Sequence, residues 1–165
     1  MAATMRACTY QKQRRGVTLV ELLAVVVLLG IFGSLAMMRY GRAILGDFGA
    51  GADATKLANG LNYAKRTAIM SGNPHALQFI PSADGSVAVG GFQLVQLDDS
   101  LRQIAVVDGP FYFAPEVAVT SVLTQITFNF EGQSLQAASV TLAGPDISYQ
   151  VTVQPINGGI STRKL

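Results

Sequence analysis

One carboxylate stands alone inside an apolar segment of the sequence. Residues 17–38 form a 22-residue stretch whose only charged side chain is Glu21. An isolated carboxylate in a membrane helix is costly unless it reaches the interface or a cationic partner. Cleavage between Gly16 and Val17 would create that partner, because the new amino group of Val17 could pair with Glu21 of a neighbouring, staggered helix. The charge pattern therefore predicts an assembly element.

Few other side chains could support catalysis. Cys8 is the only cysteine and His75 is the only histidine, so a chain that had lost its first 16 residues could contain no Cys–His site. Any triad or histidine metal site would have to use His75, which we interpret as structural or solvent-facing at the start of an expected strand. We therefore expect that the protein is not an enzyme.

The acidic residues and the paired glycines match no ligand-binding pattern. Asp84, Asp98 and Asp99 could supply oxygen ligands for calcium, but the sequence lacks the Asp-x-Asp-x-Asp-Gly spacing of a calcium loop. We expect these residues to be solvated turn carboxylates. Gly90-Gly91 lacks the downstream Gly-Lys-Ser/Thr of a phosphate loop, so a bulge or hairpin is expected there. No cofactor and no metal site is predicted.

The element that must hold Glu21 is a membrane helix. At about 1.5 Å per residue, the stretch 17–38 is long enough to cross a hydrocarbon core of roughly 30 Å. Lys12, Arg14 and Arg15 stand immediately before it. By the positive-inside rule, residues 1–16 stay in the cytoplasm and the rest of the chain is sent outward.

A conventional secretory signal is the alternative interpretation of the same segment. Ser34-Leu35-Ala36 is an acceptable small-x-small cleavage site, and cutting there would give a mature N-terminus near Met37. The apolar region would then run for about 18 residues, which is longer than the roughly 7 to 15 of most signal peptides.

The residues around Glu21 also carry a family resemblance. The run Arg14-Arg15-Gly16-Val17-Thr18-Leu19-Val20-Glu21-Leu22-Leu23 resembles the class III signal of type IV pilins and type II secretion pseudopilins. The resemblance implies that a prepilin peptidase cuts after Gly16 and methylates Val17, and that Glu21 acts in assembly. The family usually has Phe at the position of Val17 and often a shorter leader, which a start at Met5 would give.

Glycines and a helical pattern follow the apolar stretch. Residues 39–72 contain Gly41, Gly46, Gly49, Gly51 and Gly60, which weaken a helix, so we expect a bend or melted joint there, or alternatively a flexible juxtamembrane linker. Apolar residues at helical spacing then predict an amphipathic helix with one buried face. They are Leu57, Leu61, Ala64 and Ala68. Ser71-Gly72-Asn73-Pro74 ends the helix.

Residues 73–165 alternate in polarity and predict a β-rich domain. The expected strands lie near 76–80, 86–97, 101–107, 126–130, 135–143 and 148–153. The expected turns are Asp84-Gly85, Asp108-Gly109-Pro110, Glu131-Gly132 and Asn157-Gly158. One helix followed by six or seven strands gives an α+β fold.

Three downstream segments refine the resemblance. Residues 57–72, 126–132 and 151–159 are similar to the helix end, the strand-and-glycine signature and the C-terminal turn of the GspH/FimT group of minor pseudopilins. The resemblance implies a pilin-like fold, with a long N-terminal helix packed on a C-terminal antiparallel β-sandwich. It also implies a structural subunit near the tip of a periplasmic filament for type II secretion, assembled with other pilin or pseudopilin subunits on an inner-membrane platform.

The alternative function is that of a tip minor pilin acting in DNA uptake, adhesion or twitching. Beyond residue 16, eight Lys/Arg face ten Asp/Glu, for a net charge of −2, so the domain is not a basic nucleic-acid binder by charge. Arg163 and Lys164 could give a weak DNA contact, to which Lys65, Arg66 and Arg102 could add, but we expect a solvated tail.

Overall fold

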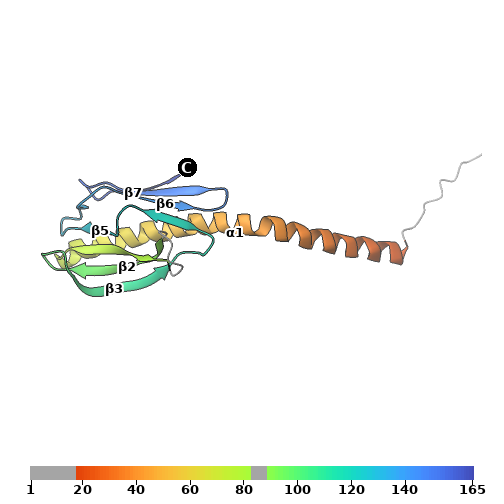
Figure 1. Cartoon of the computed structure of the whole chain (residues 1–165), viewed down its shortest axis with the longest axis horizontal. Coiled ribbons are helices and arrows are strands. Elements are labelled where there is room, and N and C mark those ends of the chain that lie inside the picture. Colours follow the sequence, from red (N-terminus) through yellow and green to blue (C-terminus); the bar gives the residue numbers. More distant parts are fainter. Residues whose placement is uncertain (1–17, 83–88) are drawn as a thin grey trace, which may run out of the picture. The chain divides into compact units, whose positions relative to one another are not determined.

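The computed structural model describes residues 18–82 and 89–165, apart from the side chains of residues 36–45. The chain divides into two compact units, with the boundary between Arg39 and Tyr40, and each is described by itself. Within the described residues, the helix α1 (Leu19–Ser71) is followed by eight strands, which all belong to the second unit (Figure 1). The predicted order of one helix followed by β structure is confirmed.

The helix α1 has a defined start and a defined end. The Thr18 carbonyl oxygen accepts the first helical hydrogen bond from the N–H of Leu22, at 3.1 Å. At the other end, the N–H of Gly72 donates to the carbonyl oxygen of Ala68 at 3.1 Å, and Gly72 has a φ of 71°. A left-handed glycine directly after the last turn is a common helix stop, so the predicted end is confirmed.

The glycine-rich stretch is helical, which corrects the prediction of a joint or linker. The helix α1 continues through residues 39–71 without interruption. A Cβ atom added at Gly46 would lie 2.6 Å from Cδ of Pro145, and one added at Gly60 would lie 2.7 Å from Cε2 of Phe92. These glycines let α1 approach the rest of the second unit closely, and this packing offsets their low helix propensity.

The strands form two four-stranded antiparallel sheets. Sheet A has the order β3-β2-β1-β5, and sheet B has the order β4-β6-β7-β8. The strands of sheet A are β1 (His75–Pro81), β2 (Val89–Leu97), β3 (Gln103–Tyr112) and β5 (Gln125–Phe128). Those of sheet B are β4 (Ala118–Ser121), β6 (Ala138–Ala143), β7 (Ser148–Val153) and β8 (Ile160–Lys164).

Several predicted boundaries within the β region are wrong. Strands β4 and β8 were not predicted, because one has only four residues and the other is mostly polar. Phe130 lies in a turn after β5 and is 58% exposed, so it does not continue the buried face of Phe128. Asp108-Gly109-Pro110 lies inside β3, where the register with β2 shifts, and does not form a turn.

Other turn predictions are confirmed. Gly132 and Gly158 have φ values of 77° and 55°, as the turns at Glu131-Gly132 and Asn157-Gly158 require. Asp84-Gly85 lies outside the described residues.

The core of the second unit joins α1 to both sheets. The predicted helix face of Leu57, Leu61, Ala64 and Ala68 is fully buried. It belongs to one hydrophobic cluster with residues of sheet A and sheet B. Among them are Leu77, Phe92, Ile126 and Phe128 from sheet A and Val140, Leu142, Val151 and Val153 from sheet B. Figure 1 shows this part of α1 running between β2 and β3 on one side and β6 and β7 on the other.

Two acidic side chains of α1 hold loops of the β region. Asp53 is 7% exposed, and its Oδ2 accepts a hydrogen bond from the N–H of Ala114 at 2.7 Å, just after β3. Oδ1 of Asp47 accepts from the N–H groups of Asp146 and Ile147, both at 3.0 Å, in the turn between β6 and β7. Each carboxylate therefore pairs backbone donors that the loop itself leaves unpaired.

Two lysines of α1 donate hydrogen bonds to backbone carbonyl groups of the β region. Nζ of Lys56 donates to the carbonyl oxygen of Tyr112 at 2.6 Å. Nζ of Lys65 donates to the carbonyl oxygens of Asn157 and Gly158 at 2.8 and 3.2 Å. The four side chains Asp47, Asp53, Lys56 and Lys65 are called the helix clamps below.

Candidate assembly site

The start of α1 is a helix cap that the sequence analysis missed. The Oγ1 atom of Thr18 accepts a hydrogen bond from the N–H of Glu21 at 3.2 Å. Thr18-Leu19-Val20-Glu21 has the Ser/Thr-x-x-Glu spacing of a capping box, so this signal was present in the sequence. An acidic residue in the first turn also interacts favourably with the positive end of the helix dipole. Glu21 thus has a local structural role in addition to the predicted role in assembly.

The residues predicted to react with the peptidase cannot be placed. Gly16 and Val17 lie outside the described residues, as does the whole leader 1–16. The cleavage site and the pairing of the Val17 amine with a neighbour's Glu21 therefore stay predictions. The side chain of Glu21 itself is exposed.

The first part of α1 presents an apolar surface on all sides. Every residue from Leu19 to Leu35 is exposed, and only Glu21 and Ser34 are polar among them. The hydroxyl group of Ser34 donates within the helix, with the carbonyl oxygens of Gly30 and Ile31 at 2.8 and 2.9 Å. Glu21 is therefore the one side chain from Leu19 to Leu35 that would bring a charge into an apolar environment. A helix that is hydrophobic all round is suited to lipid or to packing against other apolar helices.

The described residues include no helix that combines the length and the apolarity of a membrane span. Val17 and the side chains of residues 36–38 lie outside the described part of the predicted span.

The predicted cationic tip does not form a single patch. Arg163 and Lys164 belong to β8, opposite Gln150 and Tyr149 of β7, rather than to an irregular tail, and both residues are exposed to solvent as expected. Successive strand residues point to opposite faces of a sheet, so these two cations diverge. Lys65, which was considered as an addition to the patch, is one of the helix clamps.

The only histidine is a structural residue. His75 is 2% exposed, and its Nδ1 lies 2.9 Å from the carbonyl oxygen of Asn73. Asp98 accepts a hydrogen bond from the N–H of Arg102 at 2.7 Å and so stabilises a turn, as predicted. Asp84 lies outside the described residues. Within residues 18–82 and 89–165, no three His, Cys, Asp or Glu side chains gather as metal ligands would.

Comparison with known families gives two matches. The model described as "Type II transport protein GspH" matches residues 53–158, and the model described as "Prokaryotic N-terminal methylation motif" matches residues 11–37. The second match contains Gly16, Val17 and Glu21, and the first contains most of the three downstream segments that carry the predicted resemblance. No curated protein matches the chain.

Solved structures of similar fold are minor pilins and a pseudopilin. The type IV minor pilin FimU of Pseudomonas aeruginosa has a TM-score of 0.57 at 15% identity, covering 69% of this chain and 87% of FimU. The minor pseudopilin EpsH from the type 2 secretion system of Vibrio cholerae has a TM-score of 0.53 at 16% identity, covering 69% of this chain and 95% of EpsH. The predicted pilin-like α+β fold is confirmed.

Proposed function

This chain belongs to the family of the type II transport protein GspH, and from that premise we propose that it is a structural subunit at or near the tip of a periplasmic pseudopilus that serves type II protein secretion. The family is one of minor pseudopilins and minor type IV pilins, which are structural proteins rather than enzymes. The observation that carries the proposal is the succession of an N-terminal methylation motif, an exposed helix surface that is apolar except for Glu21 and Ser34, and a GspH domain in one chain.

The N-terminal motif supports a particular route to the membrane. Anchoring in the inner membrane with a periplasmic domain is the location that this motif supports. In our proposal, residues 1–16 are a cytoplasmic leader, a prepilin peptidase cuts after Gly16 and methylates Val17, and residues 17–38 cross the inner membrane. Residues 39–72 complete the helix, and residues 73–165 form the periplasmic β-rich domain.

The charge of Glu21 supports assembly rather than permanent anchoring. In the proposed filament, apolar helices pack together, and the carboxylate of Glu21 pairs with the Val17 amine of a neighbouring pilin or pseudopilin. The pair neutralises both charges in an apolar environment, where either one alone would be costly. An inner-membrane assembly platform would move the subunit from lipid into the filament.

The test is processing at Gly16. In cells that produce a prepilin peptidase, Gly16→Leu should leave the precursor uncut, because the peptidase needs a residue without a side chain before the cut. Gly30→Leu is the matched control, since a side chain at Gly30 meets nothing within 4 Å. N-terminal sequencing reads the result, with Val17 expected as the first residue. Normal cutting of Gly16→Leu, or a mature N-terminus near Met37, would refute the proposal.

A role at the tip of a type IV pilus, in DNA uptake, adhesion or twitching, is the second candidate. Its support is the likeness to FimU, which at 15% identity concerns the fold alone. The divergent directions of Arg163 and Lys164 argue against DNA as the ligand. We therefore favour the secretion role.

A further inference from the structure

The C-terminal end of α1 carries exposed apolar side chains. Ile69 and Met70, in the last turn, are 49% and 87% exposed. Two loops lie against the same end and add Phe130 and Ile156, which are 58% and 85% exposed. The four residues Ile69, Met70, Phe130 and Ile156 are called the distal cluster below. Exposed apolar side chains that gather at one place are typical of contact sites between proteins.

Contacts with α1 place both loops at this end. A Cβ atom added at Gly132 would lie 2.7 Å from Cδ1 of Ile69, so the loop that carries Phe130 packs against the last turns of the helix. Lys65 donates two hydrogen bonds to the turn that follows Ile156. The distal cluster therefore belongs to one end of the second unit.

The opposite end of the second unit has a small pocket. Its volume is about 250 Å³, and it is lined by Asp47, Phe48, Ile147 and Tyr149. Phe48 is 75% exposed, and the other three residues are partly buried. At about 1.5 Å per residue, the pocket lies about 35 Å from Met70 along α1. Ligand sites usually measure about 300 to 1,000 Å³, so this pocket is better suited to a protruding side chain than to a free ligand.

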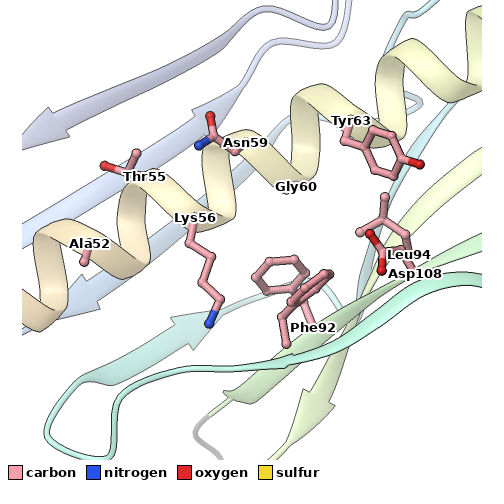
Figure 2. Close-up of a pocket in the computed structure, with 10 residues that line it drawn as sticks. Ala52, Thr55, Lys56, Asn59, Gly60, Tyr63, Phe92, Leu94 and Asp108 are labelled. Atoms are coloured by element: carbon pink, nitrogen blue, oxygen red, sulfur yellow. The ribbon is translucent and has the colours of Figure 1, made fainter.

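The hollow between α1 and strands β2 and β3 offers less apolar surface than the two ends. Figure 2 shows the Phe92 side chain below α1 near Gly60, and Phe92 is only 1% exposed. A Cβ atom added at Gly60 would lie 2.7 Å from Cε2 of Phe92. The helix and the sheet are therefore already in contact there.

The distal cluster has a cation and an anion at its rim. Arg66 lies one helical turn before Met70, and residues four apart are neighbours on a helix surface. Glu131 directly follows Phe130 in the chain. Both charged side chains are exposed.

The pocket has an anion and a cation at its own rim. Asp146 directly precedes Ile147 in the turn between β6 and β7, and Lys164 lies opposite Tyr149 in the pairing of β7 with β8. Side chains directly opposite each other in a sheet share a face, so Lys164 lies on the same face as Tyr149. Asp146 and Lys164 are both exposed. Each charge beside the distal cluster therefore has a charge of opposite sign beside the pocket.

We propose that the distal cluster of one copy of this chain packs into the pocket of a second copy. Arg66 would approach Asp146 of the second copy, and Glu131 would approach its Lys164. The occupant is a second copy because the apolar groups and the charges that complete each surface are present on this chain itself. The inference goes beyond the proposed pairing of apolar helices and does not rest on it.

The proposed contact has a definite symmetry. It joins two different surfaces, so it is heterologous and leaves each pair of copies with one unused cluster and one unused pocket. Because the two surfaces lie at opposite ends of one unit, successive copies point in the same direction and can extend as an open chain. An isologous dimer would instead be closed.

The experiment cross-links the purified full chain in detergent micelles, with Cys8→Ser as the background. One batch carries Ile156→Cys in the distal cluster, and the other carries Phe48→Cys at the pocket. A flexible bis-maleimide should link the mixed batches into dimers and link each batch alone only in traces. A chain with both substitutions should give a ladder of dimers, trimers and longer products.

Two results of this experiment would overturn the proposal. Equal cross-linking within each separate batch would show an isologous or unspecific contact. The absence of cross-links in the mixture would exclude a second copy, as expected if a different pilin covers the distal cluster in cells. Val122→Cys, at a position that is 94% exposed outside both surfaces, replaces Phe48→Cys as the matched control and should not be linked to Ile156→Cys.

A charge exchange tests the orientation of the contact. Arg66→Asp in the first batch, or Asp146→Arg in the second, should lower the yield of mixed dimers roughly two- to fivefold, because like charges would meet. With both exchanges the yield should return to that of the parent pair, a recovery that damage to folding would not produce. Asp108→Arg, on the exposed strand β3, is the control and should leave the yield unchanged. A double exchange that is weaker than either single one would refute the proposed orientation.

The proposed filament role is tested separately. The substitutions lie outside residues 11–37, which match the methylation motif, so every variant should still be cut after Gly16 in cells. Loss of cross-linking with normal cutting would reject the contact between copies alone. Loss of cutting in the wild-type chain would count against the filament role alone.

Discussion

The two described parts of α1 differ in whether their apolar side chains are buried by the rest of the chain. From Leu19 to Leu35 the helix carries large apolar side chains and exposes all of them, whereas from Gly46 to Ser71 it buries mainly alanines and leucines at helical spacing. The first part contributes nothing to the core cluster, and the second part is its centre. The difference shows that hydrophobicity alone does not decide burial, because large apolar residues stay exposed where their own chain provides no packing partner.

The largest expected effect comes from truncating a leucine in each part. Leu61→Ala should lower the free energy of unfolding of the second unit by about 2 to 5 kcal/mol, because Leu61 is fully buried. Leu28→Ala, at a position that is 53% exposed, should leave that free energy unchanged. Denaturant unfolding of the full chain in micelles measures both. Equal losses in the two variants would break the comparison.

Adding a side chain at a glycine in each part of α1 also tests the difference in packing. Gly60→Leu should destabilise the second unit by about 1 to 3 kcal/mol or more, since the new side chain would collide with Phe92. Gly30→Leu places the same side chain in open space and should be neutral for folding of that unit. Thermal unfolding is the measurement, and a stable Gly60→Leu protein would show that α1 does not approach sheet A as closely as described.

The helix clamps add a polar difference between the two described parts of α1, because all four clamp residues lie in the second part. Asp53→Ala should cost about 1 to 3 kcal/mol, since the N–H of the partly buried Ala114 would lose its acceptor. Asp53→Asn keeps an oxygen acceptor and should cost less. If the two variants unfold at the same denaturant concentration, the hydrogen bond to Ala114 does not contribute to stability.

The smallest expected effect is at the start of the first part. Thr18→Ala should destabilise the first turn of α1 by about 1 kcal/mol, because the N–H of Glu21 would lose the Oγ1 acceptor. Faster hydrogen exchange at the amides of Glu21 and Leu22 would report this fraying, with the domain amides unchanged. Thr18→Ser keeps the hydroxyl and should exchange like the wild type. Uniform exchange in all three proteins would exclude the cap.

Helix periodicity and turn chemistry could be read from the sequence, because both depend on local spacing. The buried face through Leu57 and Leu61 and the stop at Gly72 follow from that spacing. The capping box at Thr18 belongs to the same class of signal and could have been predicted.

The sequence could not predict tertiary contacts between residues that are far apart in the chain. Gly46 and Gly60 look like helix breakers until Pro145 and Phe92 are seen against them. Lys65 looks like a free cation until the turn at Gly158 is placed beside it. Tertiary packing outweighs local propensity at these positions.

The helix clamps have a mechanical consequence for a protein whose family builds filaments. Asp47, Asp53, Lys56 and Lys65 all project from one continuous helix to backbone groups beside both sheets, so a force applied to α1 would be distributed over several attachments. Bonds loaded in parallel share the force, and none can fail first without transferring its share to the others. Breaking any one of these hydrogen bonds would therefore leave the β region attached to the helix through the others.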